Sequence, residues 1–312
     1  MASELRIRPA RLEDAAAITA LHWSTVARSP DEVGPDILAR WRFGGPWMAV
    51  ESCAVHLNHL LRLPWGGVLV AEAGDEVIGE AEFYLSREAA PFGGLHLALL
   101  YVHRRWQRRG VGSALMAAVI ERARAQGLAQ ITTQPEPEAL SFYRRLGFRP
   151  WRVLHEMQAE AVWRTMAEPR PLEAWEVPPP SLALRIGRYQ CGPQEWDNLF
   201  PPLVLPGWSD LPRRVVALRL EGQPVVLALR RQVNDVAQAD GFAWLPPAMP
   251  LRPAIEALQA LAAAEGYAAV DLLLPAEAAE ALRERLGLAW QRSLTLWALP
   301  LEGRLSTSAP QV

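Results

Sequence analysis

The sequence of 312 residues predicts an α/β fold organised in two domains. Apolar segments of strand length alternate with segments of helical periodicity along the chain. After Met166 the composition changes to a proline-rich stretch, and the order of expected elements then repeats. A repeated order indicates an internal duplication. We therefore expect domains at residues 1–166 and 182–302, a proline-rich linker at 167–181, and a tail at 303–312.

The first half begins with a strand and a helical region. Acidic residues mark the start of the first helix, because negative charge is favourable at a helix N-terminus. Gly74-Asp75 predicts a hairpin between two strands. We expect strands at 4–8, 66–73, 76–86, 95–103, 130–133 and 151–162, and helices at 11–27, 31–42, 47–62, from about 113 to 127, and 137–146.

The second half follows the same order from the hairpin onward. Glu221-Gly222-Gln223-Pro224 takes the place of the first hairpin turn. We expect strands at 182–191, 214–220, 225–231, up to 246, 269–274 and 288–299, and helices at 193–200, 253–264 and 276–286.

Composition excludes several classes of protein. A net charge of −2 gives no electrostatic basis for binding nucleic acid or an anionic membrane. The chain contains no lysine, which excludes Schiff-base chemistry. Cys53 and Cys191 are too few for a secreted disulfide framework. Neither a signal peptide nor an apolar run of membrane-spanning length is visible. We expect a soluble cytoplasmic protein that has no nucleic-acid or membrane partner.

The segment after the strand at 95–103 has the features of an anion site. It is a basic, glycine-containing loop that leads directly into a helix. Gly110 and Gly112 allow the backbone to approach a ligand closely. The helix start offers unpaired N–H groups and the positive end of its dipole. Arg108 and Arg109 add charge suited to phosphate.

The spacing of this loop excludes two common phosphate-binding motifs. Without lysine it is not a Walker loop, and Ser113 stands in the wrong context for the Rossmann G-x-G-x-x-G. Gln107–Gly112 instead resembles the Q/R-x-x-G-x-G/A loop of the GCN5-related N-acetyltransferases, the GNAT family. Ala139–Phe148 resembles that family's second signature, A-x-x-F/L-Y-x-x-x-G-F.

The resemblance covers residues 4–160 strongly and the rest by the order of elements. It implies two tandem acyl-CoA N-acyltransferase (GNAT-like) domains, each a mixed β-sheet flanked by helices. It also implies an N-acetyltransferase that transfers acetyl from acetyl-CoA to a primary amine of a small molecule or peptide by direct attack. Acetyl-CoA is the expected co-substrate, and a homodimer is possible.

The resemblance also assigns cofactor and catalytic residues. Tyr143 matches the tyrosine that protonates the departing thiolate in many members, although Glu136 stands where the family often has asparagine. In the family the thioester carbonyl is polarised by the fourth strand and the pyrophosphate lies on the loop amides. The matching residues here are Leu100, Tyr101 and Val102 for the thioester, and Gln107, Arg108, Arg109, Gly110, Val111, Gly112 and Ser113 for the pyrophosphate.

The general base is open between several side chains. His96 stands where the family commonly has a glutamate, and a histidine near neutral pKa could accept an ammonium proton. Equally, His96 could be a satisfied histidine on a half-buried strand. Glu80 and Glu82 share one face of the preceding strand by period-two alternation, as rival bases or substrate-binding carboxylates. That face could also simply be solvated.

A metal site is not expected. Cys53, His56 and His59 fall three residues apart on an expected helix, but the sequence supplies no clear fourth ligand. This helix is expected to help form the wall of the acceptor pocket.

The second half lacks the features of the first loop. Pro246–Pro253 contains no glycine, and its prolines remove N–H donors. Glu280–Gly287 echoes the second signature without its tyrosine. We therefore expect a degenerate copy that serves as a scaffold or dimerisation domain. Two other functions stay open for the whole chain: a non-catalytic acyl-CoA sensor or regulator, and an assembly module.

Overall fold

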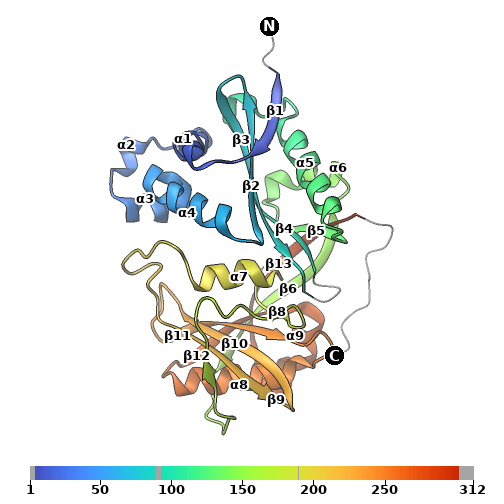
Figure 1. Ribbon diagram of the computed structural model, residues 1–312. Helices are drawn as coiled ribbons and strands as arrows, with labels where there is room; N and C mark the ends of the chain where they lie inside the picture. Colours follow the sequence, from blue (N-terminus) through green and yellow to red (C-terminus); the bar gives the residue numbers. More distant parts are fainter. Residues whose placement is uncertain (1–3, 89–92, 189, 302–312) are drawn as a thin grey trace. The chain divides into compact units, whose positions relative to one another are not determined.

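The computed structural model describes residues 4–88, 93–188 and 190–301 (Figure 1). It has the expected α/β character, with mixed β-structure flanked by helices. The described chain forms two compact units. The first comprises residues up to Leu85, Leu95–Ile131 and Pro201–Ser209, and the second comprises Ser86–Gly94, Thr132–Phe200 and the chain from Asp210. The domain boundaries expected from the sequence stay predictions, and the expected tail at 303–312 lies outside the described residues.

The first unit is built on a sheet with the order β1-β2-β3-β4, with β5 beside β4. The pairs β1–β2 and β2–β3 are antiparallel. Its strands are β1 (Leu5–Pro9), β2 (Gly66–Ala73), β3 (Glu76–Ser86), β4 (Gly94–Val102) and β5 (Gln130–Thr133), and its helices are α1 (Ala15–Trp23), α2 (Pro30–Val33), α3 (Ile37–Gly44), α4 (Val50–Arg62) and α5 (Val111–Ala125).

Helices lie on both faces of β3. Side chains of β3 alternate, so Gly79 faces α5 whereas Glu80 and Glu82 face α1 and α4. A Cβ atom on Gly79 would lie 2.9 Å from Leu115 Cδ1 and 3.0 Å from Val111 Cγ1. Glycine is therefore needed for α5 to pack this closely on the sheet.

The region between α1 and α4 differs from the sequence expectation. The helix expected at 31–42 is two helices, because Gly34, at φ +89°, ends α2. Ser29 caps α2 with a capping box, and the Asp36 carboxylate accepts the Ala39 N–H at 2.6 Å to begin α3. The helix expected at 11–27 ends earlier, at Trp23.

The second unit has a larger mixed sheet with the order β13-β6-β12-β11-β10-β9-β7. Only the β11–β12 pair is parallel among the pairs described for this unit. Its strands are β6 (Arg149–Glu160), β7 (Arg170–Pro171), β8 (Ala183–Ile186), β9 (Arg213–Leu220), β10 (Gln223–Arg231), β11 (Gln238–Leu245), β12 (Ala269–Pro275) and β13 (Ala289–Pro300), and its helices are α6 (Leu140–Arg145), α7 (Gly192–Leu199), α8 (Leu251–Ala264) and α9 (Ala276–Leu286).

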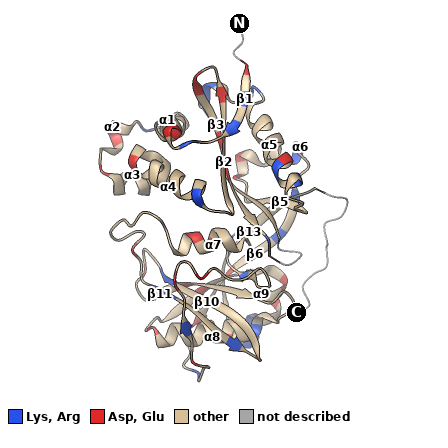
Figure 2. Ribbon diagram, in the orientation of Figure 1, with Lys and Arg blue, Asp and Glu red and all other residues tan. Residues whose placement is uncertain are grey.

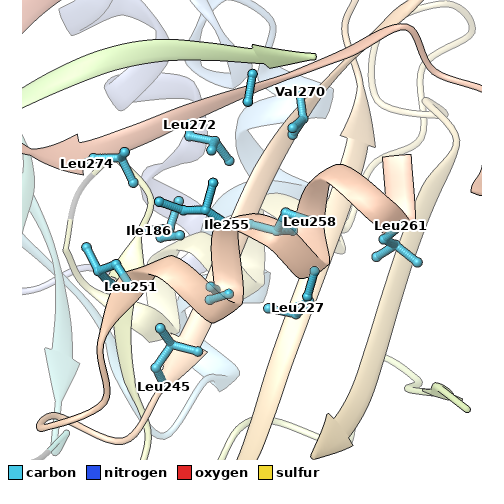
Figure 3. Close-up of a cluster of buried hydrophobic side chains, with 14 of the residues drawn as sticks. Ile186, Leu227, Leu245, Leu251, Ile255, Leu258, Leu261, Val270, Leu272 and Leu274 are labelled. Atoms are coloured by element: carbon cyan, nitrogen blue, oxygen red, sulfur yellow. The ribbon is translucent and has the colours of Figure 1, made fainter. Parts of the chain in front are cut away.

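Two apolar clusters cover opposite faces of this sheet. Along β10, Leu227 belongs to the cluster under α8 and α9, whereas Val226 belongs to the cluster that contains Trp196 of α7. Figure 3 shows Ile255 and Leu258 of α8 among strand residues of the first cluster. Successive residues of β10 are therefore buried on opposite faces of the sheet. Burial on both faces is the reason why the sequence of this strand is a continuous apolar run.

Charged residues of both signs are scattered over the described chain, in line with its nearly balanced composition (Figure 2). Within the described ranges, no helix has the length and apolar character needed to cross a bilayer.

The last strand of the first half of the sequence belongs to the second unit. β6 lies between β12 and β13 and pairs with both in antiparallel register. Leu154 and Met157 of β6 are almost completely buried. A cut at the proline-rich stretch would thus remove both hydrogen-bonding neighbours of β6 at once.

We predict that residues 1–166 do not fold alone, because both edges of β6 would expose unpaired backbone groups and buried apolar side chains. Expressed separately, this fragment should aggregate; co-expressed with residues 167–312, it should elute with that fragment as one species in size-exclusion chromatography. A monomeric 1–166 fragment that melts cooperatively at the temperature of the full chain would contradict this view of β6.

Candidate active site

The loop between β4 and α5 has the backbone shape of an anion site. Gly110 is the N-cap of α5 and adopts the left-handed conformation, φ +86°. The first hydrogen bond of the helix runs from the Ala114 N–H to the Gly110 carbonyl, at 2.9 Å. The amides of Val111, Gly112 and Ser113 therefore have no acceptor within the helix. A Cβ atom on Gly110 would meet nothing within 4 Å, so the space in front of the helix is open.

Basic side chains surround this helix start. Arg108 and Arg109 are exposed, and Arg108 also adopts a left-handed conformation, φ +62°, which is uncommon for a residue with a side chain. The Arg109 guanidinium lies 5.4 Å from the centre of the Trp106 ring. The exposed Gln107 side chain donates from Nε2 to the Val102 carbonyl at 3.2 Å. Gln107 thus holds the loop against the end of β4.

A buried acidic cluster lies on the α1 and α4 side of the same sheet. We define it as His22, Trp47, His56, Glu80, Glu82 and Tyr101. The Glu80 and Glu82 side chains are only 1% and 3% exposed, so the expectation that this face could be solvated is wrong. Glu80 Oε2 lies 2.9 Å from His22 Nε2. Glu82 Oε1 accepts the Trp47 Nε1–H at 2.8 Å, and its Oε2 lies 3.1 Å from His56 Nε2.

The two carboxyl groups of the acidic cluster differ in charge. Burial, followed by the neighbouring Glu82 charge, raises the pKa of Glu80 well above its usual value. Burial also opposes ionisation of Glu82, but His56 and the Trp47 N–H stabilise its anion and the pKa of Glu82 is lowered. Burial lowers the pKa of His22 to about 4, so this imidazole is neutral at pH 7. Of the two carboxyl groups, Glu80 is therefore the one that keeps a proton more readily, and Glu82 is the one that carries the negative charge.

Tyr101 connects the acidic cluster to the strand expected to bind the thioester. Its ring stacks on His22, with centroids 4.4 Å apart, and Trp47 stacks on the other side at 5.1 Å. His22 is thus held between two aromatic rings while it contacts Glu80. A single residue of β4 therefore joins the predicted cofactor segment Leu100–Val102 to the buried carboxylates.

The other predicted catalytic residues have different surroundings. His96 is 2% exposed on β4, and burial lowers its pKa to about 3, which makes it a weak proton acceptor. Tyr143 lies in the second unit, packs edge-on against Phe142 and Phe148, and is buried. Burial raises the pKa of Tyr143 to about 12, an effect reduced by its hydrogen bond with Thr133, so it keeps its proton at pH 7. Both catalytic roles stay predictions.

The described residues contain no group of three or more ligands suited to a metal ion. His56, one of the residues considered for such a site, instead contacts Glu82. Cys53 is buried, and burial raises its pKa to about 12, so it is a neutral thiol.

Sequence reasoning missed His22, Trp47 and His56 as partners of the carboxylates. These residues come from α1, from the 3-10 turn Pro46–Met48 and from α4. No short motif relates them to β3. Only the alternation on β3 indicated the two acidic residues.

Comparison with known proteins agrees with this description. Residues 64–150 match the family model described as an acetyltransferase (GNAT) domain. A GCN5-related N-acetyltransferase from Kribbella flavida is 16% identical, with a TM-score of 0.54, and the match covers 95% of this chain and 70% of that chain. A GCN5-related N-acetyltransferase from Anabaena variabilis ATCC 29413 is 9% identical, with a TM-score of 0.53, covering 96% and 73%. At these identities the two structures establish the fold.

A comparison with curated protein sequences gave no match. The family match, by contrast, spans both the Gln107–Gly112 loop and the Ala139–Phe148 signature. The match to the acetyltransferase (GNAT) domain model thus lies within the first half of this chain.

Proposed function

We propose that this protein transfers acetyl from acetyl-CoA to a primary amine of a small molecule or peptide. One observation carries the proposal: Tyr101 belongs to the predicted thioester strand and its ring lies on His22, which contacts the buried Glu80. The segment expected to hold the reactive carbonyl and the groups able to handle an ammonium proton are therefore one side chain apart.

The chemistry of the reaction explains why both features are useful. The loop after β4 presents the α5 amides, Arg108 and Arg109 to an anion such as a pyrophosphate. An amine in water carries a proton that must leave before its nitrogen can attack the thioester carbon. A carboxyl pair with a single negative charge favours a bound ammonium ion and offers an acceptor for that proton.

A non-catalytic acyl-CoA sensor is the second candidate function. A sensor would bind acyl-CoA through the same loop but would not need two buried carboxyl groups. Burying carboxyl groups lowers stability unless they are paired. The acidic cluster therefore favours the enzyme over the sensor. An assembly module would need neither feature.

One prediction of the proposed function concerns the loop. Gly110→Glu should weaken acetyl-CoA binding at least 100-fold, because the new side chain is strained at φ +86° and its carboxylate repels the pyrophosphate. Isothermal titration calorimetry with acetyl-CoA measures the dissociation constant. Gly74→Glu is the matched control, since Gly74 has φ +64° and equally open surroundings in the β2–β3 turn. Unchanged binding in Gly110→Glu would refute our placement of the pyrophosphate.

A second prediction concerns Tyr143. Tyr143→Phe should lower kcat for amine acetylation about 10- to 100-fold and leave the acetyl-CoA dissociation constant within threefold, because only the proton donor is removed. Release of free coenzyme A with a panel of primary amines measures kcat. Tyr267→Phe, a change of the same kind in the second unit, serves as control. Full activity in Tyr143→Phe would remove this residue from the mechanism while leaving the acetyltransferase proposal intact.

A further inference from the structure

The carboxyl pair in the acidic cluster has one oxygen that the protein leaves unused. Three of its four oxygens are engaged: Glu80 Oε2 by His22, Glu82 Oε1 by Trp47 and Glu82 Oε2 by His56. Glu80 Oε1 is buried and accepts no hydrogen bond from a donor in the described part of the chain, so the other hydrogen-bonding neighbour of this carboxyl group is the Glu82 carboxylate. An unsatisfied buried carboxyl oxygen is costly, and such atoms in native proteins usually meet a ligand or water.

The surroundings of this oxygen favour a positive ligand. Glu82 supplies a negative charge, and Asp14 adds to the negative potential at Glu80 although it is paired with the Arg8 guanidinium. His22 is neutral, and the Cys53 thiol is neutral as well.

Resting on the proposed function, we propose that the Glu80–Glu82 pair is the receptor for the ammonium group of the acceptor, and that Glu80 Oε1 takes its proton. His22, Trp47 and His56 are positioning residues that hold the other three oxygens. The acceptors selected are therefore amines that carry a positive charge in solution, rather than alcohols or weakly basic anilines.

The proton balance is as follows. A bound ammonium ion favours the ionised form of Glu80, so the proton that the resting pair holds leaves to solvent. The ammonium then gives one proton to Glu80, and its nitrogen lone pair attacks the thioester carbon. The C–N bond forms, the C–S bond breaks, and the sulfur leaves with the electron pair. The second nitrogen proton ends on the thiolate, which gives the amide and free coenzyme A.

The test compares carboxyl variants on β3. Glu80→Gln and Glu82→Gln should each lower kcat/KM for the best amine of a panel, which includes spermidine and 2-phenylethylamine, at least 100-fold. The acetyl-CoA dissociation constant should change less than threefold. Glu76→Gln, an exposed change on the same strand, should keep activity within twofold. In Glu80→Gln, kcat/KM should rise tenfold per pH unit below the pKa of the amine, because only free amine then reacts.

Several results would overturn this proposal. These are a Glu80→Gln enzyme with the rate and pH profile of the original chain, a loss of activity accompanied by loss of acetyl-CoA binding, or a loss in His96→Gln larger than in both carboxyl variants. Infrared spectroscopy tests the pair independently of turnover: at pH 7 the protonated carboxyl band should be weaker in Glu80→Gln than in Glu76→Gln, and the part that remains in both belongs to Glu88, whose pKa burial raises to about 7. If that band behaves as expected but no amine is acetylated, the proposed function fails while the charge state of the pair stands.

A different observation concerns the second half, independently of the first site. The last residues of β11, Ala243–Leu245, hold the same position before a helix as Leu100–Val102 do at the end of β4. In the second half these residues pair with β8, in the register Ala243 with Ile186 and Leu245 with Ala183. The Gly187 N–H also donates to the Leu273 carbonyl of β12 at 3.2 Å. β8 therefore bridges the ends of the two parallel strands.

The loop after β11 is occupied as well. The buried Arg185 guanidinium of β8 donates from Nη1 to the carbonyls of Pro247 at 2.5 Å and Met249 at 3.3 Å. This loop offers carbonyl oxygens to a cation, whereas the β4–α5 loop offers amides to an anion. Glu88 holds β8 from another direction, since its carboxylate accepts the Leu184 N–H at 2.9 Å.

We infer that β8 fills, in the second half, the position that the first half keeps for the cofactor, so that each chain binds one acetyl-CoA. Hydrogen exchange with saturating coenzyme A should leave the amides of 183–187 as protected as without it and should increase protection at 108–113. Calorimetry should give one site per chain, with none detected in Gly110→Glu. Loss of protection at 183–187, or new protection at 246–251, would overturn the inference.

Discussion

The burial of two neighbouring carboxyl groups on β3 is the constraint on which the first unit depends. Glu80 and Glu82 face the same side of the sheet because they are two residues apart. Uncompensated, a buried charge would cost several kcal/mol. His22, Trp47 and His56 compensate it, and each comes from a different segment between β1 and β2. The placement of α1, the turn before α4, and α4 over the sheet is thus tied to three polar contacts as well as to apolar packing.

The same sheet also positions the loop before α5. Gly79 lets α5 approach β3 on the face opposite Glu80, and the loop before α5 begins where β4 ends. The anion site and the acidic cluster therefore derive from adjacent strands whose alternation directs one set of residues to each face. A sheet is suited to this arrangement, because it keeps groups of opposite charge in fixed positions on its two sides.

Much of the fold was predictable because its signals are local. β2, β3 and β5 begin and end where alternation and the Gly74-Asp75 turn indicated, and α9 spans the residues expected. The loop at Gly110 was also predictable, since its shape depends on consecutive residues. The partners of Glu80 and Glu82 were not, because nothing in a lone His22 or His56 on a helix relates it to a strand many residues away. The pairing of β6 with β12 and β13 was missed for the same reason.

The two halves share one order of elements, but the loop before the helix presents amide donors in the first half and carbonyl acceptors in the second. In the first, a glycine at the helix N-cap exposes amide donors beside two arginines. In the second, Pro250 is the N-cap, the loop presents carbonyls, and Arg185 comes from within the chain to meet them. A loop that turns its carbonyls inward has no donors left for a phosphate, and a strand edge already paired with β8 has none left for a ligand. Satisfied backbone groups are therefore the physical basis of the inference that this half does not bind acetyl-CoA, and they also stabilise the strands that pair with β6.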